Sequence, residues 1–324
     1  MIFESAPSNE MGFLVAALAK YKGSEMKDGL LKLPEAIGKG YIKSVDLGLL
    51  KIMVHQYELK KDVTLKKTGV NAGENLITFS FRNVFYTKVK KNSSNKLQHR
   101  RLLPSVLLSS GDIDLEIFTP AGTEINAIII TVHIDLLKDL LNKKEENTLL
   151  QTIISGKESY LYEEISSPEI QNVAMKIVEA NTSEQLGDFY LKLKAEEMIY
   201  LFFVELLKRQ TLVRYPLNVS DAKVMYSIRD KLISDLSVPP NIQELVLFAN
   251  MSESKMNRLF KQIFGSSIYN YYQTLRIKEA AYLIKEEKLS VSEAGYRLGF
   301  TNLSHFTRIF ERHIGFKPKK YSAK

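Results

Sequence analysis

The sequence predicts an α+β protein of two domains: an N-terminal domain of antiparallel strands followed by helices, and a C-terminal domain made only of helices. Three observations support this prediction. A chain of 324 residues is long enough for two hydrophobic cores. Short apolar runs typical of strands occupy about residues 40–135, and helical periodicity follows over about 136–210. About the last hundred residues repeat one helical unit and carry almost all of the net positive charge.

The strand-rich region shows short apolar runs separated by Gly, Asn, Asp and Lys. We expect strands at Leu49–Leu59, Asn75–Phe85, Arg101–Leu108, Ile113–Phe118 and Ile128–Val132. Several short strands at this spacing favour a small antiparallel barrel or sandwich. The basic stretch Lys88–Arg101 is expected to be a loop or hairpin tip, and Met11–Tyr21 a short helix.

The helical region that follows ends in one long predicted helix, from Glu184 to about Gln210, which is apolar on nearly every side. Such a helix must be covered on more than one side. Two interpretations remain open here: burial between the sheet and neighbouring helices, or an interface with a second subunit. Residues 211–220, which include Pro216, are expected to link the two domains.

The last part of the chain contains the same unit twice: a short apolar helix, a tight turn and a second helix with a basic polar face. The first copy is Asn241–Phe264 with its turn at Asn250–Ser252, and the second is Ser290–Ile314 with its turn at Gly299–Thr301. Two short helices joined by such a turn form a helix-turn-helix, whose second helix can lie in the major groove of DNA. Two copies in tandem are a much more specific signal than one.

One helix, Ile268 to about Lys285, separates the two copies. A helix of about 18 residues is roughly 27 Å long. Successive major grooves on one face of DNA lie about 34 Å apart. A rigid spacer of this length, together with the offset of the attached helices, can therefore serve two neighbouring grooves.

The second helix of the first copy, Ser252–Phe264, has one apolar stripe and one polar face. Its polar face offers Ser254, Asn257, Arg258 and Lys261. Arg can bind guanine and Asn can bind adenine with two hydrogen bonds each, whereas Lys suits phosphate. The alternative is an ordinary solvated face of a surface helix, which is the commoner role of such residues.

The second helix of the second copy follows the same pattern, with Thr301 or Asn302 as its cap. Its buried stripe is expected to consist of Phe306, Phe310 and Ile314, and its polar face of Ser304, His305, Arg308 and Arg312. Leu303 either packs inward or touches a thymine methyl group. His305 has no carboxylate or second histidine at metal-ligand spacing, so we interpret it as a polar contact residue.

Two stretches resemble the AraC/XylS family of transcription regulators. Ser252–Lys261 resembles the first recognition helix of that family. The second stretch resembles the family's closing signature. It consists of Gly299 and Phe300 followed by Ser304, Phe306, Arg308, Phe310, Gly315, Pro318 and Tyr321. The resemblance covers about the last hundred residues and implies two helix-turn-helix subdomains bridged by a helix.

The resemblance also implies which residues face the bases. The matching positions are Ser254, Asn257 and Arg258 in the first helix, and Leu303, Ser304, His305 and Arg308 in the second. Two residues depart from the family pattern. Asn250 stands where the family usually has Gly, although Asn tolerates the left-handed conformation. Ser322 replaces a common terminal Arg, which puts one phosphate contact in question.

The strand-rich region resembles the cupin-type sensor domain found ahead of the DNA-binding unit in many AraC-family members, and Pro120–Thr123 resembles the turn before a barrel strand. Enzymatic cupins hold a metal through a His-x-His pair, a Glu and a distant His. The histidines of this region are His55, His99 and His133, none of them paired at that spacing. We therefore expect structural or surface roles for them, and no catalytic residue, metal or cofactor.

Charge and composition narrow the function further. From Asp221 onward the chain holds 17 Lys and Arg against 10 Asp and Glu, whereas the first 220 residues hold 28 and 27. This distribution suits a polyanionic partner for the C-terminal domain. The absence of cysteine excludes disulfides, zinc fingers and thiol catalysis. No apolar run is long enough to span a bilayer and no basic secretion signal is present, so we expect a cytoplasmic protein.

These observations predict a sequence-specific DNA-binding transcription regulator. Residues 1–210 would be the sensor and dimerisation domain, 211–220 the linker and 221–324 the DNA-binding domain. On family grounds we expect an activator controlled by a small-molecule effector, with double-stranded DNA, RNA polymerase and a second copy of the chain as partners, and no membrane. Two alternatives stay open: a cupin-type metalloenzyme with a DNA-binding tail, and a ligand-independent dimeric DNA-binding protein.

Overall fold

The computed structural model divides the chain into two compact units, which separate between Ser220 and Asp221. The structure describes residues 2–4, 25–67, 75–85, 104–110, 115–141, 148–155, 160–180, 185–209 and 217–322. The expected helix Met11–Tyr21 and the expected loop Lys88–Arg101 lie outside the described residues. The two-domain α+β organisation predicted from the sequence is confirmed.

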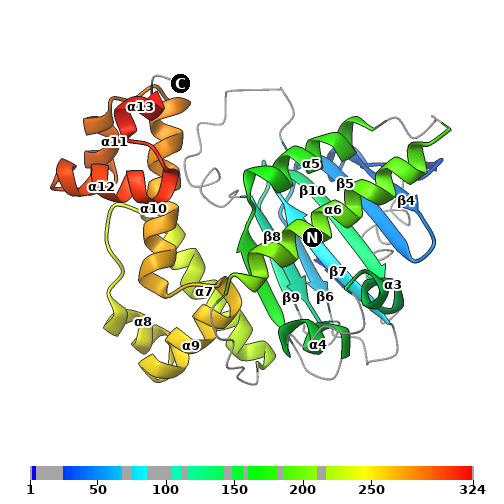
Figure 1. The fold of residues 1–324 in the computed structure, drawn as a ribbon, viewed down its shortest axis with the longest axis horizontal. Coiled ribbons are helices and arrows are strands. Elements are labelled where there is room, and N and C mark those ends of the chain that lie inside the picture. Colours follow the sequence, from blue (N-terminus) through cyan, green and yellow to red (C-terminus); the bar gives the residue numbers. More distant parts are fainter. Residues whose placement is uncertain are drawn as a thin grey trace. The chain divides into compact units, whose positions relative to one another are not determined.

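The first unit is built on an eight-stranded antiparallel sheet with the strand order β11-β8-β7-β10-β5-β4-β3-β2 (Figure 1). Its strands are β2 (Glu25–Lys27), β3 (Leu30–Lys32), β4 (Gly38–Asp46), β5 (Leu50–Leu59), β7 (Leu76–Arg82), β8 (Ser105–Ser109), β10 (Glu124–His133) and β11 (Leu161–Ile165). A smaller sheet joins β1 (Ile2–Glu4), β6 (Val63–Lys67) and β9 (Leu115–Thr119), and in it β1 pairs parallel with β6.

Among its described residues, the first unit has four helices after β10 in the chain. They are α3 (Ile134–Leu140), α4 (Thr148–Ser155), α5 (Pro168–Glu179) and α6 (Gly187–Leu207). Local capping explains where two of them begin. The backbone N–H of Asp135 donates to the His133 ring at the start of α3, and Ser167 accepts from Ile170 at the start of α5.

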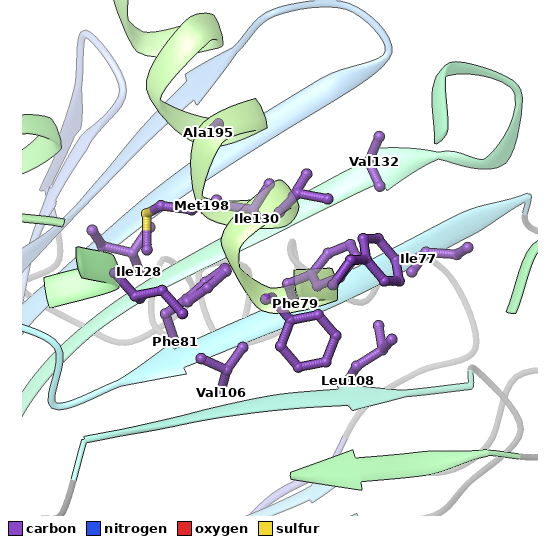
Figure 2. Close-up of a cluster of buried hydrophobic side chains, with 14 of the residues drawn as sticks. Ile77, Phe79, Phe81, Val106, Leu108, Ile128, Ile130, Val132, Ala195 and Met198 are labelled. Atoms are coloured by element: carbon purple, nitrogen blue, oxygen red, sulfur yellow. The ribbon is translucent and has the colours of Figure 1, made fainter. Parts of the chain in front are cut away.

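One face of the large sheet is apolar and lies under α5 and α6 (Figure 1). Strand pairing puts Val54 and Phe81 on either side of Ile128 on this face, because directly paired residues point to the same side of a sheet. Phe79 packs edge to face on Phe202 of α6, with ring centroids 5.5 Å apart. Figure 2 shows Met198 of α6 reaching the same cluster. This buried layer fixes α6 to the sheet.

The five strands expected from the sequence appear as β5, β7, β8, β9 and β10, with β10 twice as long as expected. Strands with more polar residues, such as β4 and β6, were not expected. The expected helical region also contains a strand, β11, whose pairing with β8 buries Leu161 and Tyr162. β7 ends at Arg82, earlier than expected, because Asn83 takes a left-handed conformation with φ 54°.

The second unit consists of helices only among its described residues. These are α7 (Val219–Ser234), α8 (Ile242–Ala249), α9 (Glu253–Phe264), α10 (Ile268–Lys285), α11 (Val291–Arg297), α12 (Leu303–Ile314) and α13 (Pro318–Ser322). The predicted spacer helix coincides with α10. Helix α7 begins at Val219, inside the stretch expected to be a linker, and residues 210–216 lie outside the described part of the chain. None of the helices that the structure describes is long and apolar enough to cross a membrane.

Candidate nucleic-acid interface

The first helix-turn-helix consists of α8 and α9. Asn250 ends α8 in the left-handed conformation, with φ 49° and ψ 44°, as its short polar side chain allows. Ser252 caps α9 by accepting a 3.3 Å hydrogen bond from the backbone N–H of Lys255. The Lys255 ammonium lies 2.9 Å from the carboxylate of Asp221 in α7. Lys255 therefore attaches α9 to α7 and does not belong to the outward polar face.

Helix α9 has a buried side that is mostly apolar and an exposed polar side. The predicted buried stripe is confirmed for Met256, Leu259, Phe260, Ile263 and Phe264. On the opposite side Ser254, Arg258 and Lys261 are exposed and Asn257 is half-buried. Spacings of three and four residues place these four side chains along one face of the helix. The structure thus brings together the four residues that the sequence assigned to DNA in this helix.

The second helix-turn-helix consists of α11 and α12. Ser290 and Glu293 form a reciprocal capping box at the start of α11, with hydrogen bonds of 3.2 and 2.9 Å. Gly295 lets α12 approach closely, because a Cβ at this position would stand 2.9 Å from Leu303 Cδ2. Leu303 is half-buried against α11. Of its two expected roles, the structure shows the inward packing.

Helix α12 presents the second polar face. Asn302, rather than Thr301, caps it by accepting a 3.0 Å hydrogen bond from the His305 backbone. Phe306 and Phe310 are buried, but Ile314 is only half-buried, so the buried stripe is shorter than expected. The exposed side chains are Ser304, His305, Arg308 and Arg312. Four of the five assigned residues of this helix therefore point to solvent.

Comparison with known proteins agrees with this geometry. Residues 245–324 match the family model described as a helix-turn-helix domain. These residues form a helix-turn-helix domain of the AraC type. We refer to it below as the AraC-type domain.

Similar proteins include two curated relatives and one solved structure. The HTH-type transcriptional activator RhaR of Enterobacter sp. (strain 638) is 29% identical over 131 residues, which cover 39% of this chain and 46% of that protein. The Msm operon regulatory protein of Streptococcus mutans is 24% identical over 185 residues, covering 55% and 63%. The chain thus spans less than two thirds of each relative. An AraC-type transcriptional regulator from Chromobacterium violaceum is 23% identical with a TM-score of 0.30, covering 33% of this chain and 95% of that one.

Further positive charge lies at the end of the AraC-type domain. Lys317, Lys319 and Lys320 are exposed at and beside α13, a helix that packs on α12 through Phe310 and Tyr321, with ring centroids 5.6 Å apart. These lysines are not among the residues that the sequence pattern assigned to DNA. Their positive charge and their position just after α12 in the sequence could have indicated phosphate contacts, because such contacts need only exposed cations near a recognition helix.

The two described histidines of the first unit, His55 and His133, occupy structural positions. Burial lowers the pKa of His55, in β5, to about 4, so this side chain is neutral at physiological pH. His133 caps α3, and His99 lies outside the described residues. Within the described stretches, no three His, Asp or Glu side chains gather in a way that could hold a metal ion.

Proposed function

We propose that the chain is a sequence-specific DNA-binding regulator of transcription, acting through its AraC-type domain. The observation that carries this proposal is the pair of exposed polar faces on α9 and α12, each backed by a buried apolar stripe and both attached to α10. In this proposal Asn257, Arg258 and Arg308 read base edges, and Lys261 and Arg312 bind phosphates. Ser254, Ser304 and His305 add polar contacts, and Leu303 contributes mainly by packing.

Replacing Arg258 or Arg308 by Ala tests the base contacts. Each substitution is expected to weaken binding to the preferred DNA by about 1–3 kcal/mol and to relax sequence preference at one position. Gel-shift titrations on a selected site and on single-base variants measure both effects. Arg297→Ala is the matched control, because it removes a positive charge that is already paired with Glu287 at 2.9 Å. Equal affinity of all three variants and the parent would refute the assignment.

The first unit is proposed to join two copies of the chain. Helix α6 lies on the sheet with one side (Figure 1). Its other side carries a stripe of exposed apolar side chains. The exposed side chains of this stripe are those of the N-cap residue Leu186 and of Phe189, Leu193, Tyr200 and Leu207. Exposed apolar side chains aligned on one helix face are typical of a helix-helix interface. A second copy presents the same stripe and can therefore cover it.

Control by a small-molecule effector, activation through RNA polymerase and action in the cytoplasm belong to the same proposal. They rest on the resemblance to AraC-family regulators, whose curated examples here are named as an activator and an operon regulatory protein. DNA affinity measured with and without metabolite pools separates a sensor from a ligand-independent dimer. A shift in affinity supports effector control, and identical affinity across all pools supports the ligand-independent alternative.

A further inference from the structure

The turn of the second helix-turn-helix motif and the segment that leads into the first lie beside one turn of α10, where Arg276 is buried. This side chain is only 5% exposed, although arginines are rarely buried without partners. Burial lowers the pKa of its guanidinium, which reflects the cost of keeping a charge inside the domain. No carboxylate pairs with it among the described residues, so its partners must be sought in carbonyl groups and rings.

Arg276 holds the turn of the second motif. Its Nε donates a 2.7 Å hydrogen bond to the backbone carbonyl of Leu298, and its guanidinium lies 3.7 Å above the centre of the Phe300 ring. Both partners flank Gly299, from which the chain enters α12. A charge-assisted hydrogen bond and a cation–π contact are stronger in a buried setting than in water. The starting point of α12 is therefore fixed on α10.

Tyr272, one helical turn earlier, holds the segment that leads into the first motif. Its hydroxyl donates a 2.8 Å hydrogen bond to the carbonyl of Leu236, between α7 and α8. The next residue, Ser237, lies against Gly299, because a Cβ on Gly299 would collide with the Ser237 carbonyl oxygen. Gly299 also has φ +74°, a conformation that favours glycine. The segment that leads into the first motif and the turn of the second thus lie in direct contact beside α10.

We propose that the junction formed by Tyr272, Arg276 and Gly299 sets the separation and rotation between α9 and α12, so that the protein selects the spacing of two DNA half-sites as well as their bases. This inference rests on the proposed DNA-binding function. Inserting one base pair moves a half-site by about 3.4 Å and rotates it by about 34°. Buried hydrogen bonds and direct backbone contact hold this junction rigid. The two recognition helices therefore cannot adjust to both the shift and the rotation of a half-site.

Arg276 and Tyr272 are positioning residues in this scheme, because they contact carbonyl groups and rings of their own chain. Their effect should therefore show in the tolerated spacing and not in the preferred bases. Two variants weaken the junction from different sides. Tyr272→Phe removes one hydroxyl and keeps the ring. Arg276→Lys keeps the positive charge but loses the planar guanidinium, which donates a hydrogen bond to Leu298 and stacks on the Phe300 ring at the same time.

The test uses the full chain and double-stranded DNA selected from a random pool by the parent protein. Affinity is then measured on the selected site and on sites whose half-site spacing is one base pair shorter or longer. The parent is expected to lose about 10- to 100-fold in affinity when the spacing changes, since the contacts of one recognition helix are lost. In Tyr272→Phe and Arg276→Lys this penalty is expected to fall to about threefold or less, with unchanged base preference.

Arg297→Lys is the matched control, because Arg297 lies on α11, outside the junction, and pairs with Glu287. It should keep the spacing profile of the parent. Junction variants that also keep this profile would overturn the inference. A parent that selects DNA but accepts all spacings would overturn it too, while leaving the proposed function standing. A parent that selects no DNA would overturn both. If Arg276→Lys is unfolded in a thermal melt, Tyr272→Phe alone decides.

Discussion

The fragment Asp221–Lys324 is expected to bind double-stranded DNA by itself, with an affinity that falls by about 10³- to 10⁵-fold between about 50 and 200 mM salt. The size of this effect assumes roughly 6–10 phosphate contacts, each of which releases counterions from the DNA. The fragment carries 17 Lys and Arg against 10 Asp and Glu, and Lys261, Arg312 and Lys319 are exposed near its recognition helices. Electrostatic attraction to phosphates should therefore dominate its affinity.

Fluorescence anisotropy titrations at a series of salt concentrations give the slope of log affinity against log salt. The fragment of residues 1–210, with almost balanced charge, serves as the control and is expected not to bind. Affinity that does not change with salt would contradict docking of the two helices into grooves. Binding by the 1–210 fragment and not by the C-terminal fragment would show that the DNA site lies in the first unit, which would contradict the prediction.

Phe202→Glu is expected to unfold the first unit or to destabilise it by at least about 4 kcal/mol. Phe202 is fully buried and packs on Phe79, and its ring lies 5.6 Å from that of Phe203. A glutamate at this position would lose the packing of the ring and would bury its carboxylate away from water. A thermal melt of the variant measures the loss. A melting temperature equal to that of the parent would contradict the placement of this face of α6 in the core.

Phe189→Glu should behave in the opposite way, because Phe189 is 59% exposed on the outer side of α6. We expect an unchanged melt and loss of the dimer in sedimentation experiments. Lys192→Glu, at an exposed polar position of the same helix, is the control. It should keep both the melting temperature and the dimer of the parent. A parent chain that stays monomeric at high concentration and on DNA would end the dimer proposal.

The helix-turn-helix motifs were predicted nearly to the residue because their ends are set by local chemistry. Ser252, Ser290 and Asn302 each accept a hydrogen bond from a backbone N–H three residues later. Asn250 and Gly315 end their helices in the left-handed conformation. All of these interactions lie within a few residues of one another, so the sequence contains both partners in one short window.

The sheet was predicted less completely because a strand is stabilised by partners that are distant in the sequence. β11 pairs with β8, more than fifty residues earlier, and its short sequence Leu161–Ile165, with two adjacent glutamates, does not by itself indicate a strand. β4 contains two glycines and two lysines, yet it forms nine residue pairs with β5. Such segments become strands through hydrogen bonds with a neighbour, and their own propensity contributes little.

The sequence by itself determined the two-domain organisation, the paired helix-turn-helix motifs, the concentration of positive charge and the polar residues that we propose for DNA binding. The tertiary structure alone decided which side of α6 belongs to the core and which is exposed, and that Lys255 forms an ion pair with Asp221. It also decided that Leu303 packs inward and that Arg276 donates a hydrogen bond to a turn 22 residues away. The physical reason is the range of the interactions. Periodicity and capping act within one or two helical turns, whereas burial and partner choice depend on which distant segments fold against a side chain.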